Sequence, residues 1–112
     1  MSIHHIGTIV LSESDVLKNL ESTQSLMQHA CRASGLTIVK ESFHQFKPYG
    51  VAGSIILTDC NITIHTWPYK NEITFEMCAF GDYAKSYSFL GFFFKTLHPT
   101  LRFTNFQTFH RK

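Results

Sequence analysis

A strictly alternating segment lies near the middle of the chain, within the stretch Leu57-Thr58-Asp59-Cys60-Asn61-Ile62-Thr63-Ile64-His65-Thr66-Trp67-Pro68. Successive side chains of a β-strand point to opposite faces of its sheet. The pattern therefore predicts a strand over residues 61–67, in which Ile62, Ile64 and Thr66 share one face. We expect that face to be core, and the opposite face to be free to carry a site.

An acid and a thiol, Asp59 and Cys60, come directly before this strand. The Cys60 side chain stands beside the peptide carbonyl of Asp59, and His65 follows five residues after the thiol. A thiolate is a strong nucleophile, and an imidazole can serve as a general base. We therefore interpret Asp59, Cys60 and His65 as candidates for chemistry on the backbone itself. A packed strand histidine is the alternative interpretation of His65.

Composition limits the class of protein. The 112 residues suffice for one ordinary core, so residues 1–112 are predicted to form a single domain. Apolar residues make up 44% and charged residues 16% of the chain, which excludes a disordered protein. The net charge is +2 and the Lys and Arg residues are scattered, so we expect no nucleic-acid partner. No segment is apolar enough to span a bilayer, so we expect no membrane partner.

The cysteine pattern bears on cellular location. Cys31, Cys60 and Cys78 form no paired framework, which is typical of reduced thiols in the cytosol. The first residues lack the basic and apolar regions of a signal peptide. We therefore expect a cytoplasmic protein. No set of His, Cys or carboxylate residues has the spacing of metal ligands, so no metal site is predicted.

The segments on either side of the central strand predict an α+β fold. Further strands are expected at residues 5–11, 36–43, 51–57, 72–80 and 101–109, and helices at residues 14–34 and 83–97. The polar cluster Ser12–Asp15 has the chemistry of a helix N-cap, and Gly35 that of a C-terminal cap. Helices among largely hairpin-connected strands indicate a two-layer sandwich, with a mainly antiparallel sheet and two helices on one face.

The second predicted helix is unusually aromatic. Residues at three- and four-residue spacing predict its buried stripe: Tyr87, Leu90, Phe94 and Leu97. Other rings lie beyond this stripe: Phe89, Phe92 and Phe93. Either the helix is buried on two sides or it meets a partner, and we favour oligomerisation.

Two motifs, His44-x-Phe46-x-Pro48-x-Gly50-Val51-x-Gly53 and Ile64-His65-Thr66-Trp67-Pro68, resemble those of the bacterial S-adenosylmethionine decarboxylases, and the likeness covers nearly the whole chain. In that family a proenzyme cleaves itself within a Glu-Ser-His motif, and the Ser becomes an N-terminal pyruvoyl group. This carbonyl forms a Schiff base with the substrate amine and serves as an electron sink for decarboxylation. The resemblance implies an α/β/β/α assembly of two sandwiches, as a homodimer or as a heterodimer with an active relative.

The resemblance also assigns roles to particular residues. The cleavage motif corresponds to Asp59-Cys60-Asn61, so Cys60 would give the pyruvoyl cofactor through an acyl shift to a thioester and a β-elimination. His65 matches the processing histidine of the family. Phe46 and the neighbourhood of Trp67 match the aromatic region that stacks on adenine, and these rings could equally be core.

Besides the cleavage motif, where Asp59-Cys60-Asn61 stands for Glu-Ser-His, three further positions depart from the family pattern. Phe80 stands where the family has its proton-donating Cys. Cys78 lies one pleat repeat earlier on the same strand face, roughly 6.5 Å away, and is a candidate substitute. Ala52 replaces a processing Ser. Tyr69 replaces the Glu that holds the ribose hydroxyls, at a position where it remains a candidate for substrate contact.

The sequence thus predicts a divergent, self-processing decarboxylase of polyamine (spermidine) biosynthesis, acting on S-adenosylmethionine or another small amine-bearing substrate. The alternative is an unprocessed, noncatalytic homologue that regulates an active relative or binds a nucleoside. The departures at residues 59–61, Ala52 and Phe80 favour that alternative. A Phe-rich structural domain without a small-molecule site ranks last, because it leaves His65 unexplained.

Overall fold

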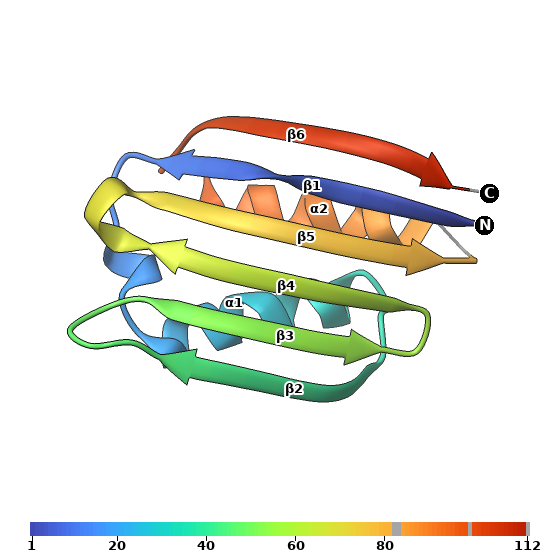
Figure 1. Cartoon of the computed structure of the whole chain (residues 1–112), viewed down its shortest axis with the longest axis horizontal. Helices are drawn as coiled ribbons and strands as arrows, with labels where there is room; N and C mark the ends of the chain where they lie inside the picture. The colour runs from blue at the N-terminus through green and yellow to red at the C-terminus, as the bar shows by residue number, and fades with distance from the viewer. Residues whose placement is uncertain (82–83, 99, 112) are drawn as a thin grey trace.

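The computed structural model describes residues 1–81, 84–98 and 100–111. These residues form one six-stranded sheet, and two α-helices lie behind a single face of it (Figure 1). The strands are β1 Ser2–Leu11, β2 Ile38–Gln45, β3 Val51–Leu57, β4 Cys60–Trp67, β5 Glu72–Phe80 and β6 Leu101–Arg111. The helices are α1 Leu20–Ala33 and α2 Ala84–Leu97, with 3-10 turns η1 Asp15–Leu17 and η2 Pro68–Lys70. The predicted two-layer α+β sandwich is confirmed.

The strand order places β4 in the interior of the sheet. The order is β2-β3-β4-β5-β1-β6, and each neighbouring pair is antiparallel. Short connections join β2 to β5 in sequence order, whereas β1 lies between β5 and the C-terminal β6 (Figure 1). Ile62 of β4 pairs with Ile55 of β3 on one side and with Met77 of β5 on the other. The central strand therefore has its position set from both sides.

The core lies between one face of the sheet and the two helices. In β4 the buried residues are Cys60, Ile62, Ile64 and Thr66. The residues between them point to the face without a helix among the described residues, which we call the open face: Asn61, Thr63, His65 and Trp67. The predicted alternation of β4 is confirmed. Apolar burial drives this arrangement, with each fully buried large side chain contributing about 2–3 kcal/mol.

The N-terminal helical segment is divided, which corrects the prediction of one helix over residues 14–34. Asn19 has extended dihedral angles (φ −125°, ψ 155°), so a helix cannot run through it. Its side-chain oxygen accepts a hydrogen bond from the Ser22 backbone N–H at 2.9 Å. Asn19 is therefore the N-cap of α1, and the polar cluster Ser12–Asp15 instead leads into the short η1 turn, which begins at Asp15. Gly35 has φ 79° just beyond the helix, as its predicted role as a C-terminal cap requires.

Helix α2 buries Leu90 and Leu97 as predicted, but the rest of its buried stripe differs from the prediction. The buried residues are Ser86, Phe89, Leu90, Phe93 and Leu97. Phe89 and Phe93 pack on Phe75 of β5, with ring centroids 5.8 and 5.5 Å apart, so packing against the sheet selects this set. Tyr87 is instead 50% exposed. The predicted start of the helix at residue 83 lies outside the described residues. Neither described helix has the length and apolar character needed to cross a membrane.

The bounds of several strands differ from the prediction: β1, β4 and β6 are longer, and β2 is shifted by two residues. β1 begins at Ser2, which pairs with Phe80, and β4 begins at Cys60, which pairs with Ala79. β2 covers residues 38–45 instead of 36–43, and β6 continues to residue 111. A strand continues as far as its neighbour offers backbone partners, and a single-sequence pattern does not reveal that neighbour. One consequence is that Cys60 belongs to β4, so its side chain points to a defined face of the sheet.

Candidate functional site

Strand β4 carries the predicted site residues on two different faces of the sheet. The Cys60 side chain lies on the helix-covered face and is only 5% exposed. His65 lies five positions later on the open face. At about 3.3 Å per residue along a strand, the two Cα atoms are roughly 16 Å apart. The structure therefore does not bring Cys60 and His65 of one chain together.

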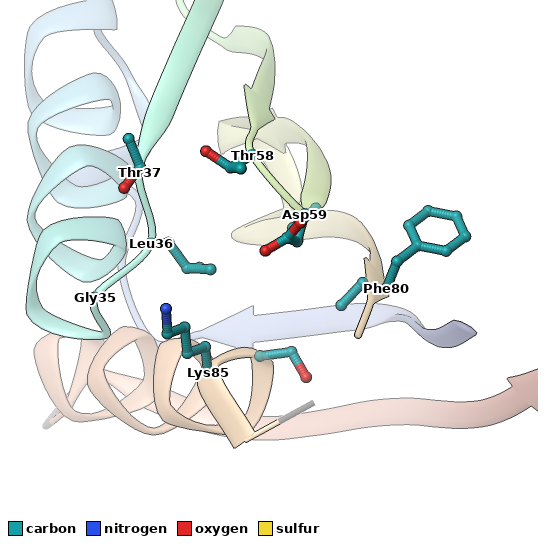
Figure 2. Close-up of a pocket in the computed structure, with 10 residues that line it drawn as sticks. Gly35, Leu36, Thr37, Thr58, Asp59, Phe80 and Lys85 are labelled. Carbon is teal, nitrogen blue, oxygen red and sulfur yellow. The ribbon is translucent and has the colours of Figure 1, made fainter. Parts of the chain in front are cut away.

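Cys60 lines a small cavity at the end of the sheet where β3 turns into β4. The cavity has a volume of about 130 Å³ and is bounded by that turn, by residues 35–37 and by the start of α2. Asp59, Lys85 and Ser86 also line it. Figure 2 shows the side chains of Asp59 and Lys85 reaching into this space from opposite sides. The peptide bond between Asp59 and Cys60 thus lies at the wall of a partly polar cavity.

The Cys60 thiol is held in its protonated form. Burial raises its pKa to about 12, and the neighbouring Cys31, Cys78 and Asp59 add to the shift. The thiol contacts the backbone carbonyl oxygen of Asn61 at 3.7 Å, as a weak donor. A nucleophilic reaction of this sulfur at neutral pH consequently needs a base that removes the proton as the new bond forms.

A buried histidine stands behind the cavity. The Nε2 atom of His5 lies 3.1 Å from the hydroxyl of Ser86, and its Nδ1 atom lies 2.9 Å from the hydroxyl of Thr108. The His5 side chain has no exposed surface, and its ring meets Tyr87 edge-on with centroids 5.1 Å apart. Burial, together with the nearby His110 and His4, lowers the pKa of His5. The imidazole is therefore neutral at physiological pH and can accept a proton.

His5 was missed by sequence reasoning, which identified it only as the first residue of a strand. The alternation of β1 was available as a signal. It places His5 on the same face as Ile3 and Ile9, which are fully buried. A polar residue among core residues at period two needs hydrogen-bond partners, and this need marks it for attention.

On the open face, His65 lies inside a row of rings, which we call the aromatic row: His44, Phe46, His65, Trp67 and Tyr69. The His65 ring lies nearly parallel to that of Trp67, with centroids 3.8 Å apart and an interplanar angle of 7°. On its other side the Phe46 centroid is 5.3 Å away at 18°. Tyr69 meets Trp67 edge-on at 6.3 Å. The structure thus brings the predicted residues Phe46, Trp67 and Tyr69 together around His65.

The aromatic row is anchored by hydrogen bonds to β5. The indole Nε1–H of Trp67 donates to the Thr74 hydroxyl at 3.1 Å, and that hydroxyl donates to the backbone carbonyl of His65 at 3.4 Å. Partial burial lowers the pKa of His65, which favours the neutral imidazole. At His65 the row therefore presents a neutral imidazole that can accept a proton, between the flat rings of Phe46 and Trp67.

Cys78 lies on the open face of β5, paired with Asn61 of β4. Its sulfur is 3.8 Å from Nε2 of His4, and burial raises the pKa of this thiol, which favours the protonated form. Phe80, which is half exposed on the same face, donates its backbone N–H to the carbonyl oxygen of Asp59 at 2.8 Å. Phe80, and not Cys78, is thus the residue of β5 bonded to the Asp59 backbone. No group of three or more His, Cys, Asp or Glu side chains suited to a metal ion occurs within the described ranges.

Known proteins resemble this chain in both sequence and fold. The model of the S-adenosylmethionine decarboxylase family matches residues 3–111. The S-adenosylmethionine decarboxylase proenzyme of Fervidobacterium nodosum is 33% identical over 96 residues, covering 83% of this chain and 70% of the relative. That of a Hydrogenobaculum species is 30% identical over 100 residues, covering 89% and 75%. The crystal structure of the adenosylmethionine decarboxylase from Aquifex aeolicus VF5 matches with a TM-score of 0.90 at 25% identity, covering 99% of this chain and 90% of that one.

Proposed function

The chain belongs to the S-adenosylmethionine decarboxylase family, and on that premise we propose that it is a pyruvoyl-dependent decarboxylase that cleaves itself between Asp59 and Cys60. The observation that carries the proposal is the position of this peptide bond, which follows a turn, begins a strand and borders the cavity. Cleavage there would leave residue 60 as a new chain end beside the cavity. The single core between sheet and helices supports treating residues 1–112 as one domain.

The chemistry of self-cleavage balances without an external reagent other than water. The Cys60 sulfur attacks the carbonyl carbon of Asp59, the peptide C–N bond breaks, and the thiol proton ends on the Cys60 nitrogen, which gives a thioester. Removal of the Cα proton of Cys60 then expels the thiocarboxylate of Asp59 and leaves dehydroalanine. Hydrolysis releases ammonia and leaves a pyruvoyl end. That group would supply the electron sink for loss of carbon dioxide from the substrate.

The elimination base in this proposal is His65 from a second copy of the chain. Within one chain the imidazole is roughly 16 Å away along the strand and on the opposite face from the thiol. Suppose that two copies pack with their open faces together, related by a two-fold axis that makes their β4 strands run in opposite directions. The His65 end of one β4 would then lie over the Cys60 end of the other. The distance along β4 therefore supports a dimer in which each site draws on both copies.

The open face also has the character of a contact surface. Large apolar side chains lie exposed on it: Ile6, Ile56, Phe80, Phe103 and Phe109. A contiguous exposed apolar surface is typical of a protein interface. Covering it with a second copy would give the α/β/β/α arrangement. A heterodimer with an active relative would use the same surface.

Substrate recognition is assigned to the aromatic row. The exposed or half-buried rings of Phe46, Trp67 and Tyr69 offer flat surfaces for a purine, which supports S-adenosylmethionine or another small amine-bearing molecule as substrate. Cys78 is the proton donor in this scheme, because its thiol is protonated and faces the same side. The product would enter polyamine (spermidine) biosynthesis, and the three free thiols support a reducing, cytoplasmic location.

A second candidate function is an unprocessed, noncatalytic homologue that binds a nucleoside or regulates an active relative. The observation in its favour is Phe80, a side chain that cannot donate a proton, at the family's catalytic position. The buried, protonated Cys60 also slows the first step of processing.

Intact mass of the freshly purified protein under denaturing conditions tests the proposal. We expect two fragments, residues 1–59 and 60–112, the second with the mass of a pyruvoyl end. Cys60→Ala is the control and should remain one chain. An uncut wild-type chain after long incubation would refute self-processing and leave the noncatalytic homologue. A second fragment that begins with an intact Cys60 would show thioester hydrolysis without cofactor formation.

A further inference from the structure

We propose that Ser86 and His5 form the proton relay that activates the Cys60 thiol for the first step of self-cleavage. This inference rests on the proposed self-processing and assigns the base for that step to the helix-covered side of the sheet. Two separate proton transfers would then use two histidines on opposite faces: His5 for the acyl shift and His65 for the elimination.

The location of the relay carries the inference. Ser86, in the first turn of α2, lines the same cavity of about 130 Å³ as Cys60 and the peptide bond that would break. The Ser86 hydroxyl is 3.1 Å from Nε2 of His5. A cavity of this size and polarity can also hold water that bridges the two side chains. The relay thus connects the cavity to a proton acceptor that is itself shielded from solvent.

The relay requires one tautomer of His5, and the hydroxyl partners of its two ring nitrogens permit that tautomer. With Nδ1 protonated and donating to the Thr108 hydroxyl at 2.9 Å, Nε2 carries the lone pair that faces Ser86. Tyr87 packs against the edge of the ring and holds its plane. Thr108 and Tyr87 are therefore positioning residues for the base.

Every proton in the acyl shift is accounted for. The thiol of Cys60 gives its proton to the Ser86 hydroxyl oxygen as Ser86 gives its own proton to Nε2 of His5. The sulfur attacks the Asp59 carbonyl carbon, and the C–N bond breaks. The Cys60 nitrogen then takes one proton back from His5 through Ser86. No oxidant, reductant or water is consumed.

Other groups near the cavity fit this role less well. Lys85 presents an ammonium group, which donates hydrogen bonds and accepts none. His65 of the same chain lies on the opposite face of the sheet. The Asp59 carboxylate is the remaining rival base, and an Asp59→Asn variant separates it from the relay.

Hydroxylamine resolves the two steps of processing and therefore tests the relay. It cleaves a thioester to give residues 1–59 as a hydroxamate and residues 60–112 with an N-terminal Cys60. We expect His5→Gln and Ser86→Ala to form these fragments about a hundredfold more slowly than wild type, the lower range of general base catalysis. Ser86→Thr, which keeps the hydroxyl, should restore the rate. His65→Ala should give hydroxylamine fragments at the wild-type rate, because its block comes after the thioester.

The outcomes distinguish this inference from the proposed function. A wild-type chain that processes, with His5→Gln and Ser86→Ala processing at the same rate, would overturn the relay alone. The relay alone would also be overturned if Asp59→Asn blocks the acyl shift while His5→Gln does not. A wild-type chain that neither cleaves nor yields hydroxylamine fragments would overturn self-processing and the relay together. Ser86→Ala removes only one oxygen atom and should disturb the fold least. If His5→Gln does not fold, the processing rate of Ser86→Ala therefore tests the relay.

Discussion

Cys60 and His65 lie on the same strand, β4, with their side chains on opposite faces of the sheet. The thiol faces the helices and the imidazole is stacked on Trp67 on the open face. This relationship divides the proposed processing between two surfaces. It also requires a second copy of the chain wherever both residues are to act on one site.

Co-expression of two defective chains tests whether His65 acts across a dimer. Cys60→Ala and His65→Ala, each carrying a different tag, should separately give no pyruvoyl fragment. In the mixed dimer the His65→Ala chain keeps its Cys60 and receives an imidazole from its partner. We expect that chain, and not the other, to yield residues 60–112 with a pyruvoyl end by mass spectrometry.

The control for co-expression is a chain with both substitutions, paired with either single variant. His65→Ala paired with the doubly substituted chain should show no pyruvoyl fragment. A mixed dimer that forms but leaves both chains unprocessed would contradict the shared site.

Phe46→Ala should weaken binding of S-adenosylmethionine by about 1–3 kcal/mol, the range for stacking of a base on an aromatic ring. Calorimetry on the Cys60→Ala background measures this without turnover. Phe92→Ala is a matched control, because Phe92 on α2 has the same 38% exposure as Phe46 and lies outside the aromatic row. Equal affinities of the two variants would remove Phe46 from the site.

Alkaline pH should destabilise the fold through its buried thiols. The pKa of Cys60 rises from 9.0 to about 12 on folding, so between these values the folded state keeps a proton that the unfolded state loses. The free energy of unfolding is therefore not reduced by this ionisation below pH 9. Above pH 9 it falls by at most about 1.4 kcal/mol per pH unit for each such thiol. Urea unfolding on both sides of pH 9 measures the slope. Cys60→Ser should flatten it. Cys31, whose pKa is also raised to about 12, and Cys78, whose pKa is also raised, should account for the remainder. An unchanged slope would show that Cys60 is not buried as a thiol.

Acid should destabilise the fold through His5. Its pKa is lowered from 6.5, so as pH falls below 6.5 the unfolded state takes up a proton that the folded state rejects. The loss is at most about 1.4 kcal/mol per pH unit. The groups that face the ring are Ser86 and Tyr87 of α2 and Thr108 of β6, with His110 and His4 nearby. His5→Gln should be less stable at neutral pH and less sensitive to acid by thermal melting. Equal acid sensitivity in both proteins would argue against a buried neutral His5.

Two glycine substitutions should change stability in opposite directions. A Cβ atom at Gly7 of β1 would lie 2.4 Å from the backbone oxygen of Asn105 and closer still to the Phe106 ring, so Gly7→Ala should separate β1 from β6. We expect a loss of about 1–3 kcal/mol, as for other overpacked positions. Gly91 lies on the exposed side of α2 with no atom within 4 Å of such a Cβ. Gly91→Ala should therefore stabilise by about 1 kcal/mol, the difference in helix propensity. A stabilising Gly7→Ala would contradict the β1–β6 packing.

Local patterns in the sequence were sufficient for the class of fold and for the core face of Ile62 and Ile64. The period-two alternation of β4 predicted which side of Ile62 and Ile64 would be core. Gly35 marked the end of α1. The sequence also predicted Phe46, Trp67 and Tyr69 as candidates for substrate contact, and the structure brings them together around His65. These features depend on residues near one another in the chain or on motifs of fixed spacing.

Two features of the candidate site depended on contacts between distant segments. The buried stripe of α2 was ambiguous because two sets of aromatic residues have helical spacing, and only the position of Phe75 on β5 selects Phe89 and Phe93. The Ser86–His5–Thr108 network joins α2, β1 and β6, which meet only in the folded sheet. Sequence by itself determined the alternation, the turns and the family motifs. Tertiary structure alone decided which face of the sheet holds the Cys60 thiol and which buried base stands near it, because these depend on strand pairing across the whole chain.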